Sequence, residues 1–157
     1  MIMDAGLQPV ILLASLIVLL LLYITVRKRS QFSRMDRMTG EEFEEWCAAG
    51  FRKIGYDAVV TKASGDYGVD ILLYKRRLIG RSKRPYAAVQ AKCYSGKVGV
   101  AAVQQAAAGK AYYKAKTAMV ATNSTYTKPA IELAQANGVR LLDGSLLERL
   151  FAKEVSL

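Results

Sequence analysis

The sequence predicts an α/β domain with a mixed sheet flanked by helices, preceded by one helix long and apolar enough to span a membrane. Three observations predict this architecture. One uncharged apolar stretch lies near the N-terminus, at residues 9–26. The rest of the chain reads in the order α-β-β-β-α-β and then α-β-α. Successive strands favour antiparallel pairing, whereas strands separated by helices favour parallel crossovers.

The stretch at residues 9–26, PVILLASLIVLLLLYITV, contains no charged side chain. As a helix it spans about 27 Å, close to the ~30 Å hydrocarbon core of a bilayer. All 23 Lys and Arg residues follow it, so residues 1–8 are expected outside and the remainder in the cytoplasm. The expected location is therefore the cell membrane, as a single-pass protein. A cleaved signal peptide is the alternative, but no basic residue precedes the apolar run and no obvious cleavage site follows it.

Residues 27–38 are polar and basic, and we interpret them as a linker to a domain at residues 39–152. The domain begins with a helix, because Thr39 and Glu42 have the spacing of a capping box. Gly55 is expected to end this helix.

Five strands are predicted from short aliphatic runs bounded by turn residues. They lie at residues 56–61, 69–74, 86–94, 117–122 and 139–143. The remaining helices are predicted at residues 99–116, from the cap Thr127 to Gly138, and from the cap Ser145 onward.

Composition limits the chemistry of the domain. The net charge of +10 favours an anionic partner, either nucleic acid or an acidic membrane surface. The chain has no histidine, so catalysis must rely on carboxylates, lysine, hydroxyls or thiols. The two cysteines, Cys47 and Cys93, form no CxxC motif and are expected to be packed, reduced thiols.

The strand YAAVQAKCY places Gln90 and Lys92 on one face of an otherwise apolar segment. A buried charge is costly unless it is paired, so these side chains need a partner. Asp70 lies near the start of the preceding strand, which should pair with this one. A carboxylate beside a lysine on neighbouring strands is a way to build a divalent-metal phosphodiesterase site without histidine. The alternatives are a turn-capping aspartate and a lysine that extends from a strand end.

The stretches GDYGVDILLY, VQAKCY and VGVAAVQQ through LLDGSLL together resemble the Mrr-like branch of the PD-(D/E)XK nuclease superfamily, over roughly residues 39–150. The resemblance implies a restriction-endonuclease-like αβββαβ core. It also implies DNA endonuclease activity of the type IV restriction kind, directed at foreign or modified DNA.

Residue by residue, the resemblance implies that Asp70 binds Mg²⁺ or Mn²⁺, that Gln90 replaces the second acidic residue of the superfamily, and that Lys92 is the catalytic lysine. It further implies that Glu44 and the backbone carbonyl of Ala91 are metal ligands. Because glutamine is neutral, this metal site has one negative charge fewer than a site with two carboxylates.

The segment at residues 75–84 carries six basic side chains, which we interpret as contacts to DNA phosphates. They are Lys75, Arg76, Arg77, Arg81, Lys83 and Arg84. The alternative is contact with anionic lipid.

The function expected from the sequence is a membrane-anchored, Mg²⁺-dependent endodeoxyribonuclease. One alternative is a catalytically inactive nuclease-fold module that binds DNA or acts as a scaffold at the membrane, and another is a basic protein that contacts lipid alone. Because each chain would carry one site, cutting both strands calls for a homodimer or for two separate events.

Overall fold

The computed structural model describes residues 7–61, 67–76, 80 and 82–152. The chain divides into two compact units, residues 1–34 and residues 35–157, which are described separately.

The first unit is built on helix α1 (Leu7–Met35). The helix therefore continues through most of the segment interpreted as a linker, because no Gly or Pro interrupts residues 27–35. Large apolar side chains from Val10 to Ile24 are 40–66% exposed. Within the described part of the chain, no helix meets both the length and the apolar character needed to cross a membrane, so the span predicted at residues 9–26 lacks structural support.

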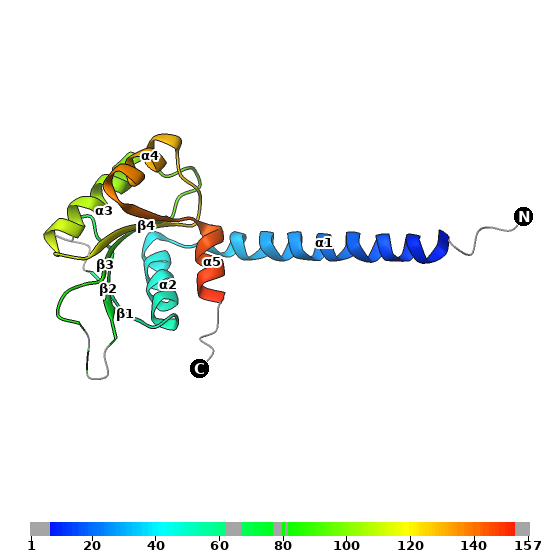
Figure 1. The fold of residues 1–157 in the computed structure, drawn as a ribbon, viewed down its shortest axis with the longest axis horizontal. Helices are drawn as coiled ribbons and strands as arrows, with labels where there is room; N and C mark the ends of the chain where they lie inside the picture. Colours follow the sequence, from blue (N-terminus) through cyan, green and yellow to red (C-terminus); the bar gives the residue numbers. More distant parts are fainter. Residues whose placement is uncertain (1–6, 62–66, 77–79, 81, 153–157) are drawn as a thin grey trace, which may run out of the picture. The chain divides into compact units, whose positions relative to one another are not determined.

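The second unit contains one five-stranded sheet in the order β1-β2-β3-β4-β5 (Figure 1). Its strands are β1 (Tyr56–Val60), β2 (Ile71–Lys75), β3 (Ala87–Lys92), β4 (Thr117–Thr122) and β5 (Val139–Leu142). The first three strands pair antiparallel and the last three pair parallel. The mixed sheet and the order of elements predicted from the sequence are confirmed.

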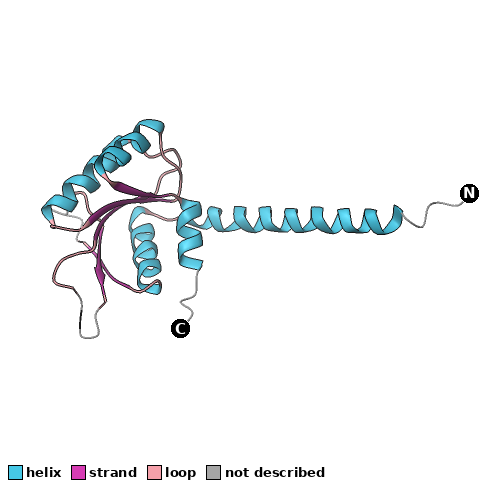
Figure 2. Ribbon diagram, in the orientation of Figure 1, coloured by secondary structure: helices cyan, strands magenta, loops and turns pink. Residues whose placement is uncertain are grey.

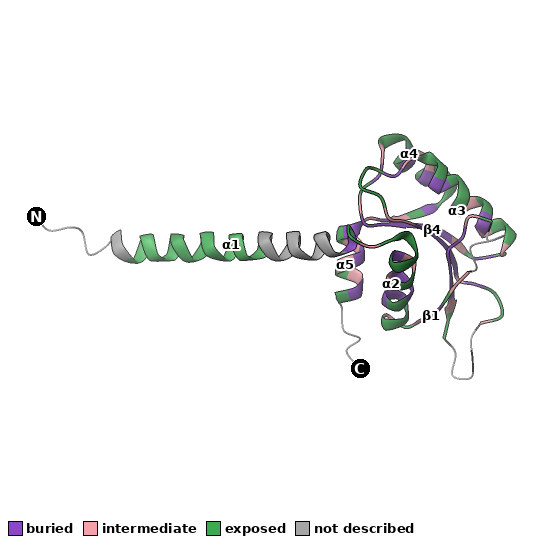
Figure 3. Cartoon of the chain, turned by 180° about the vertical axis from the view of Figure 1, so that it is seen from behind, coloured by how far each residue is buried: buried purple, intermediate pink, exposed green. Residues whose placement is uncertain are grey.

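Helices cover both faces of this sheet, as Figures 1 and 2 show. They are α2 (Gly40–Lys53), α3 (Val100–Tyr112), α4 (Lys128–Asn137) and α5 (Gly144–Ala152). Helices α2 and α5 lie on one face, and α3 and α4 lie on the other. Each face has its own apolar cluster, one around Phe43, Val89 and Phe151 and the other around Val103 and Val120. Figure 3 shows the buried residues concentrated in the strands and on the inner sides of the helices.

The predicted helix caps are confirmed in two of three places. The Thr39 side chain accepts a hydrogen bond from the Glu42 N–H, and the Thr39 N–H donates to the Glu42 carboxylate, which completes the capping box. Thr127 caps α4, and Gly138 ends it with φ of +61°.

The third cap differs from the prediction. Asp143, not Ser145, caps α5, because its Oδ1 accepts from the Leu146 N–H at 2.8 Å. Ser145 instead donates its hydroxyl to the same carboxylate oxygen. A carboxylate is a strong N-cap acceptor and lies one turn ahead of Leu146, so it takes the capping position.

Candidate active site

The register of the β2–β3 hairpin sets the position of the predicted acidic residue. Ile71 pairs with Val89, so Asp70, one residue before β2, lies opposite Gln90. The Asp70 N–H donates to the Val89 carbonyl at 2.9 Å, which extends the ladder by one bond. The strand predicted at residues 69–74 therefore begins at Ile71, and Asp70 is the residue directly before its N-terminal end.

Asp70 and Gln90 form a buried polar pair. The Gln90 Nε2 donates a short hydrogen bond to the Asp70 Oδ2, and the Ala91 N–H donates to the same oxygen at 2.6 Å. Gln90 is only 2% exposed, and Asp70 is also buried. A buried carboxylate needs hydrogen-bond donors, and these two groups supply them. The polar residue in the apolar strand is thus explained by the carboxylate on its neighbour.

The oxygen atoms at this pair suit a hard divalent cation. The Gln90 Oε1 is buried and has no hydrogen-bond partner among the described residues, although its amide lies against Asp70. The Ala91 carbonyl lies next to the same amide, 3.4 Å from its Nε2. Carboxylate, amide and carbonyl oxygens are the donors that Mg²⁺ and Mn²⁺ prefer. No group of three His, Cys, Asp or Glu side chains gathers as a metal site in the described structure, so a metal here would depend on the amide and the carbonyl.

Two glycines allow the turn before Asp70 to pack closely against helix α3. A Cβ at Gly109 would lie 2.0 Å from the Val69 Cγ2, and a Cβ at Gly68 would lie 2.7 Å from the Gln105 Cβ. Gly68 also has φ of +73°, a conformation that favours glycine. The turn packed on α3 leads directly into Asp70, which lies just before the N-terminal end of β2.

An acidic cleft of about 850 Å³ opens beside Asp70. Its lining comes from α2, the end of β1 and the Asp70 turn: Thr39, Gly40, Glu41, Glu44, Glu45, Val60, Thr61 and Asp70. Glu44, which the resemblance implies is a metal ligand, therefore lines the same cleft as Asp70. Glu41 and Glu45 also line the cleft and were not predicted. Glu42 serves the capping box instead.

Lys92 is the last residue of β3 and lies two positions after Gln90, on the same face of the strand. It is half-buried and pairs in register with Thr122 of β4. Its role as the catalytic lysine stays a prediction.

The two cysteines are free thiols, as predicted. Burial raises the pKa of Cys47 far above its ordinary value, and the nearby Cys93, Glu44 and Asp70 raise it further. Burial, with a contribution from Asp36, also raises the pKa of Cys93. Both thiols therefore stay protonated at neutral pH, which disfavours a role as nucleophile or metal ligand.

The described residues of the basic segment predicted to contact DNA lie away from this site. Lys75, Arg76, Lys83 and Arg84 are exposed, and Arg77 and Arg81 lie outside the described residues. The segment joins the end of β2 to the start of β3, at the opposite end of β2 from Asp70. At about 3.4 Å per residue, five strand residues separate the two ends by roughly 17 Å. The Lys75 Nζ lies 5.0 Å from the centre of the Tyr86 ring.

Asn123 is a buried polar residue whose structural role the sequence did not reveal. Its Oδ1 accepts from the Tyr94 N–H at 2.8 Å, and its Nδ2 donates to the Asp36 Oδ1 at 2.7 Å. These bonds hold the end of β3, just beyond Lys92, against the segment that enters α2. In the sequence, a polar residue after a buried strand indicates only a turn.

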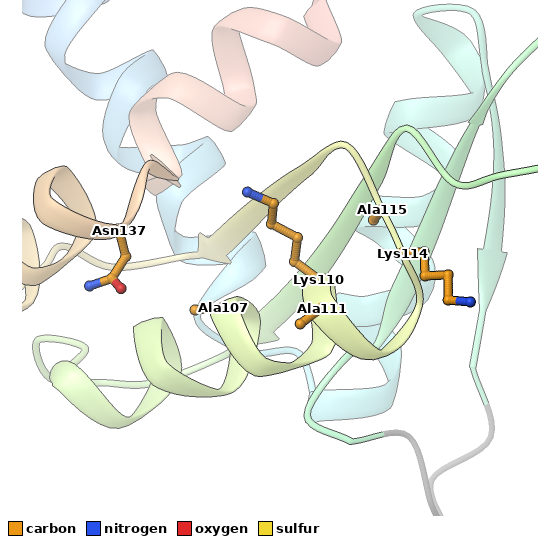
Figure 4. Close-up of a pocket in the computed structure, with 6 residues that line it drawn as sticks. All are labelled: Ala107, Lys110, Ala111, Lys114, Ala115 and Asn137. Carbon is orange, nitrogen blue, oxygen red and sulfur yellow. The ribbon is translucent and has the colours of Figure 1, made fainter.

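A second hollow, of about 380 Å³, lies between the ends of α3 and α4. Figure 4 shows that the side chains of Lys110 and Lys114 point away from each other there. Because the two ammonium groups do not converge, this hollow does not form an anion site.

The mixed five-stranded sheet flanked by helices is a fold of the restriction-endonuclease-like class. The family model Mrr_cat, described as restriction endonuclease, matches residues 35–151. The chain therefore belongs to this restriction endonuclease family. No curated protein matches the sequence.

Three solved structures share the fold. The DNA modification-dependent restriction endonuclease AspBHI has a TM-score of 0.58 at 21% identity, covering 78% of this chain and 34% of its own. MspJI restriction endonuclease, in complex with a 27-mer oligonucleotide, has a TM-score of 0.53 at 19% identity, covering 78% and 29%. AF1548, a protein of unknown function, has a TM-score of 0.52 at 14% identity, covering 68% and 63%. This chain thus spans less than two thirds of each of these structures.

Proposed function

We propose that this protein is a metal-dependent endodeoxyribonuclease that hydrolyses phosphodiester bonds. The observation that carries the proposal is the buried pair of Asp70 and Gln90 on adjacent strands, with an orphaned amide oxygen and with Lys92 two residues further on. Family membership over residues 35–151 supports the same reaction class.

Each residue has a distinct part in this proposal. Asp70, the Gln90 amide and the Ala91 carbonyl would hold Mg²⁺ or Mn²⁺, with Glu44 available from the other side of the cleft. To bind the cation, the Gln90 amide would turn so that its Oε1 takes the place of the Nε2 that faces Asp70. A cation bound there would lower the pKa of its bound water and polarise the scissile phosphate. Lys92 orients the attacking water or accepts its proton, and it offsets the charge that develops on the phosphate.

The substrate proposed is DNA, with modified foreign DNA as its finer form. Support comes from AspBHI, which is described as DNA modification-dependent, and from MspJI, whose structure contains an oligonucleotide. The exposed lysines and arginines of the β2–β3 hairpin would contact phosphates away from the cut. A double-strand break would need two copies of the chain or two separate cleavage events.

The nuclease proposal predicts that the full chain nicks plasmid DNA with Mg²⁺ and not with EDTA. Asp70→Ala should reduce nicking to background, because it removes the carboxylate that anchors the site. Glu132→Ala, which removes an exposed carboxylate on α4, is the matched control and should keep the wild-type rate. Methylated and unmethylated plasmids tested side by side would reveal modification dependence. Equal nicking by Asp70→Ala and wild type would refute this site.

We also propose that the first unit anchors the protein to a membrane with the nuclease domain in the cytoplasm. The support is the uncharged sequence at residues 9–26, the exposure of its large apolar side chains and the position of all Lys and Arg residues after it. The full chain should sediment with membranes after an alkaline wash, and deletion of residues 1–26 should release it. A reporter fused after Leu157 should report a cytoplasmic location. A full chain that stays in the supernatant would contradict anchoring.

A further inference from the structure

Two exposed tyrosines stack on each other near the candidate active site. The ring centroids of Tyr67 and Tyr112 lie 3.8 Å apart, with 26° between the ring planes. Despite this contact, the two residues are 57% and 55% exposed. Tyr113 meets the Tyr112 ring edge-on, with centroids 5.0 Å apart. We refer to Tyr67 and Tyr112 as the tyrosine platform.

The backbone holds the platform in place. Tyr67 has φ of +49°, which is uncommon for a residue other than glycine. Gly109, one turn before Tyr112 on α3, lies so close to the turn that its Cβ would be 3.3 Å from the Tyr67 carbonyl oxygen. The close packing of the turn on α3 therefore brings the backbone of Tyr67 next to the helix that carries Tyr112. Exposed tyrosine rings are suited to binding, because a tyrosine side chain loses little conformational entropy when a partner stacks on it.

The chain after Asp70, which includes Tyr112 but not Tyr67, is rich in basic residues. From Ile71 through Ile131 there are 12 Lys and Arg residues and no Asp or Glu. This stretch includes the whole of α3, and exposed Lys114 and Lys116 follow Tyr112 directly. Aromatic rings beside positive charge are the combination that binds nucleic acid through base stacking and phosphate contacts.

We propose that the tyrosine platform stacks on an unpaired nucleobase of the DNA substrate. The inference rests on the proposed nuclease function and adds a preference for DNA with unpaired nucleotides near the cut. Paired bases within a duplex have their faces covered by their neighbours, whereas an unpaired base exposes its π-face to a tyrosine ring.

The platform and the candidate metal site can act on one strand. Tyr67 lies three residues before Asp70, so their Cα atoms are at most about 11 Å apart at 3.8 Å per residue. At roughly 3.4 Å per nucleotide of one strand, this distance corresponds to about three nucleotides. A base on the platform would therefore lie within a few nucleotides of the phosphate at Asp70.

The test is DNA binding by the full chain, purified in mild detergent, with EDTA present so that no cleavage occurs. Three fluorescent probes share one sequence: a single strand, a perfect duplex and a duplex with a three-nucleotide bulge. Wild type should bind the single strand and the bulge more tightly than the duplex. Tyr112→Ala should weaken binding to those two probes about tenfold and leave the duplex unchanged, because one stacked base is lost. Tyr112→Phe should keep wild-type affinity.

Ile131→Ala is the matched control, since it truncates an exposed apolar side chain on α4 and should change no affinity. Melting temperatures of all variants would show that each is folded. Equal affinity of Tyr112→Ala and wild type for the single strand would overturn the platform, as would an equal loss on all three probes or a wild type that binds none of them. The nuclease proposal is judged separately, by plasmid cleavage with the wild-type protein. No cleavage together with a Tyr112-dependent preference for unpaired DNA would refute the nuclease function and support the platform. Cleavage without that preference would support the nuclease function and refute the platform.

Discussion

Lys92→Ala is expected to lower the rate of DNA cleavage by about 10²–10⁴-fold, the usual contribution of a positioned acid–base group. Affinity for DNA and the melting temperature should change little. The reason is that Lys92 is half-buried at the end of β3 and acts on the water and the developing charge, which matter mainly in the transition state. Single-turnover plasmid cleavage with saturating protein measures this rate without a contribution from binding.

Two further variants sharpen the role of Lys92. Lys92→Arg keeps the positive charge but cannot accept a proton near neutral pH. Recovery of most of the activity by arginine would indicate charge stabilisation, and an arginine variant as slow as alanine would indicate proton transfer or a geometric demand. Lys97→Ala removes an exposed lysine five residues away and should leave the rate unchanged. A wild-type rate for Lys92→Ala would rule out the lysine as part of the site.

The Asp70–Gln90 pair was accessible to sequence reasoning because it depends on two local regularities. Side chains alternate along a strand, and two consecutive strands joined by a loop pair with each other. The structure confirms both, since the hairpin register places the residues opposite each other. The assignment needed no knowledge of contacts beyond the hairpin.

Other features depend on contacts that no local pattern encodes. The bond between Asp36 and Asn123 joins residues 87 positions apart, and the packing of Gly109 on Val69 joins a helix to a turn far from it in sequence. Glu41 and Glu45 line the cleft only because α2 lies across the end of β1. Such positions follow from how helices pack on the sheet.

Gln90→Glu is expected to make the stability of the protein depend on a divalent metal. In the metal-free protein, the substitution replaces the Nε2 donor with a second carboxylate against Asp70, at a position only 2% exposed. The loss of the donor and the repulsion between two buried carboxylates should cost about 3 kcal/mol. The melting temperature in EDTA should therefore fall by about 10 °C.

Saturating Mg²⁺ should restore most of this loss, because the cation binds the folded state and the second carboxylate strengthens that binding. Lower pH should also restore stability in EDTA, since protonation of one carboxyl group removes the repulsion. The sign follows from proton binding: the folded variant holds a proton more tightly than the unfolded chain, so its stability falls as pH rises.

Gln104→Glu makes the same charge change at an exposed position of α3 and should show neither response. Melting curves for both variants with EDTA and with Mg²⁺ measure these changes in stability. A Gln90→Glu melting temperature equal to that of wild type in both conditions would mean that Gln90 does not face a metal beside Asp70.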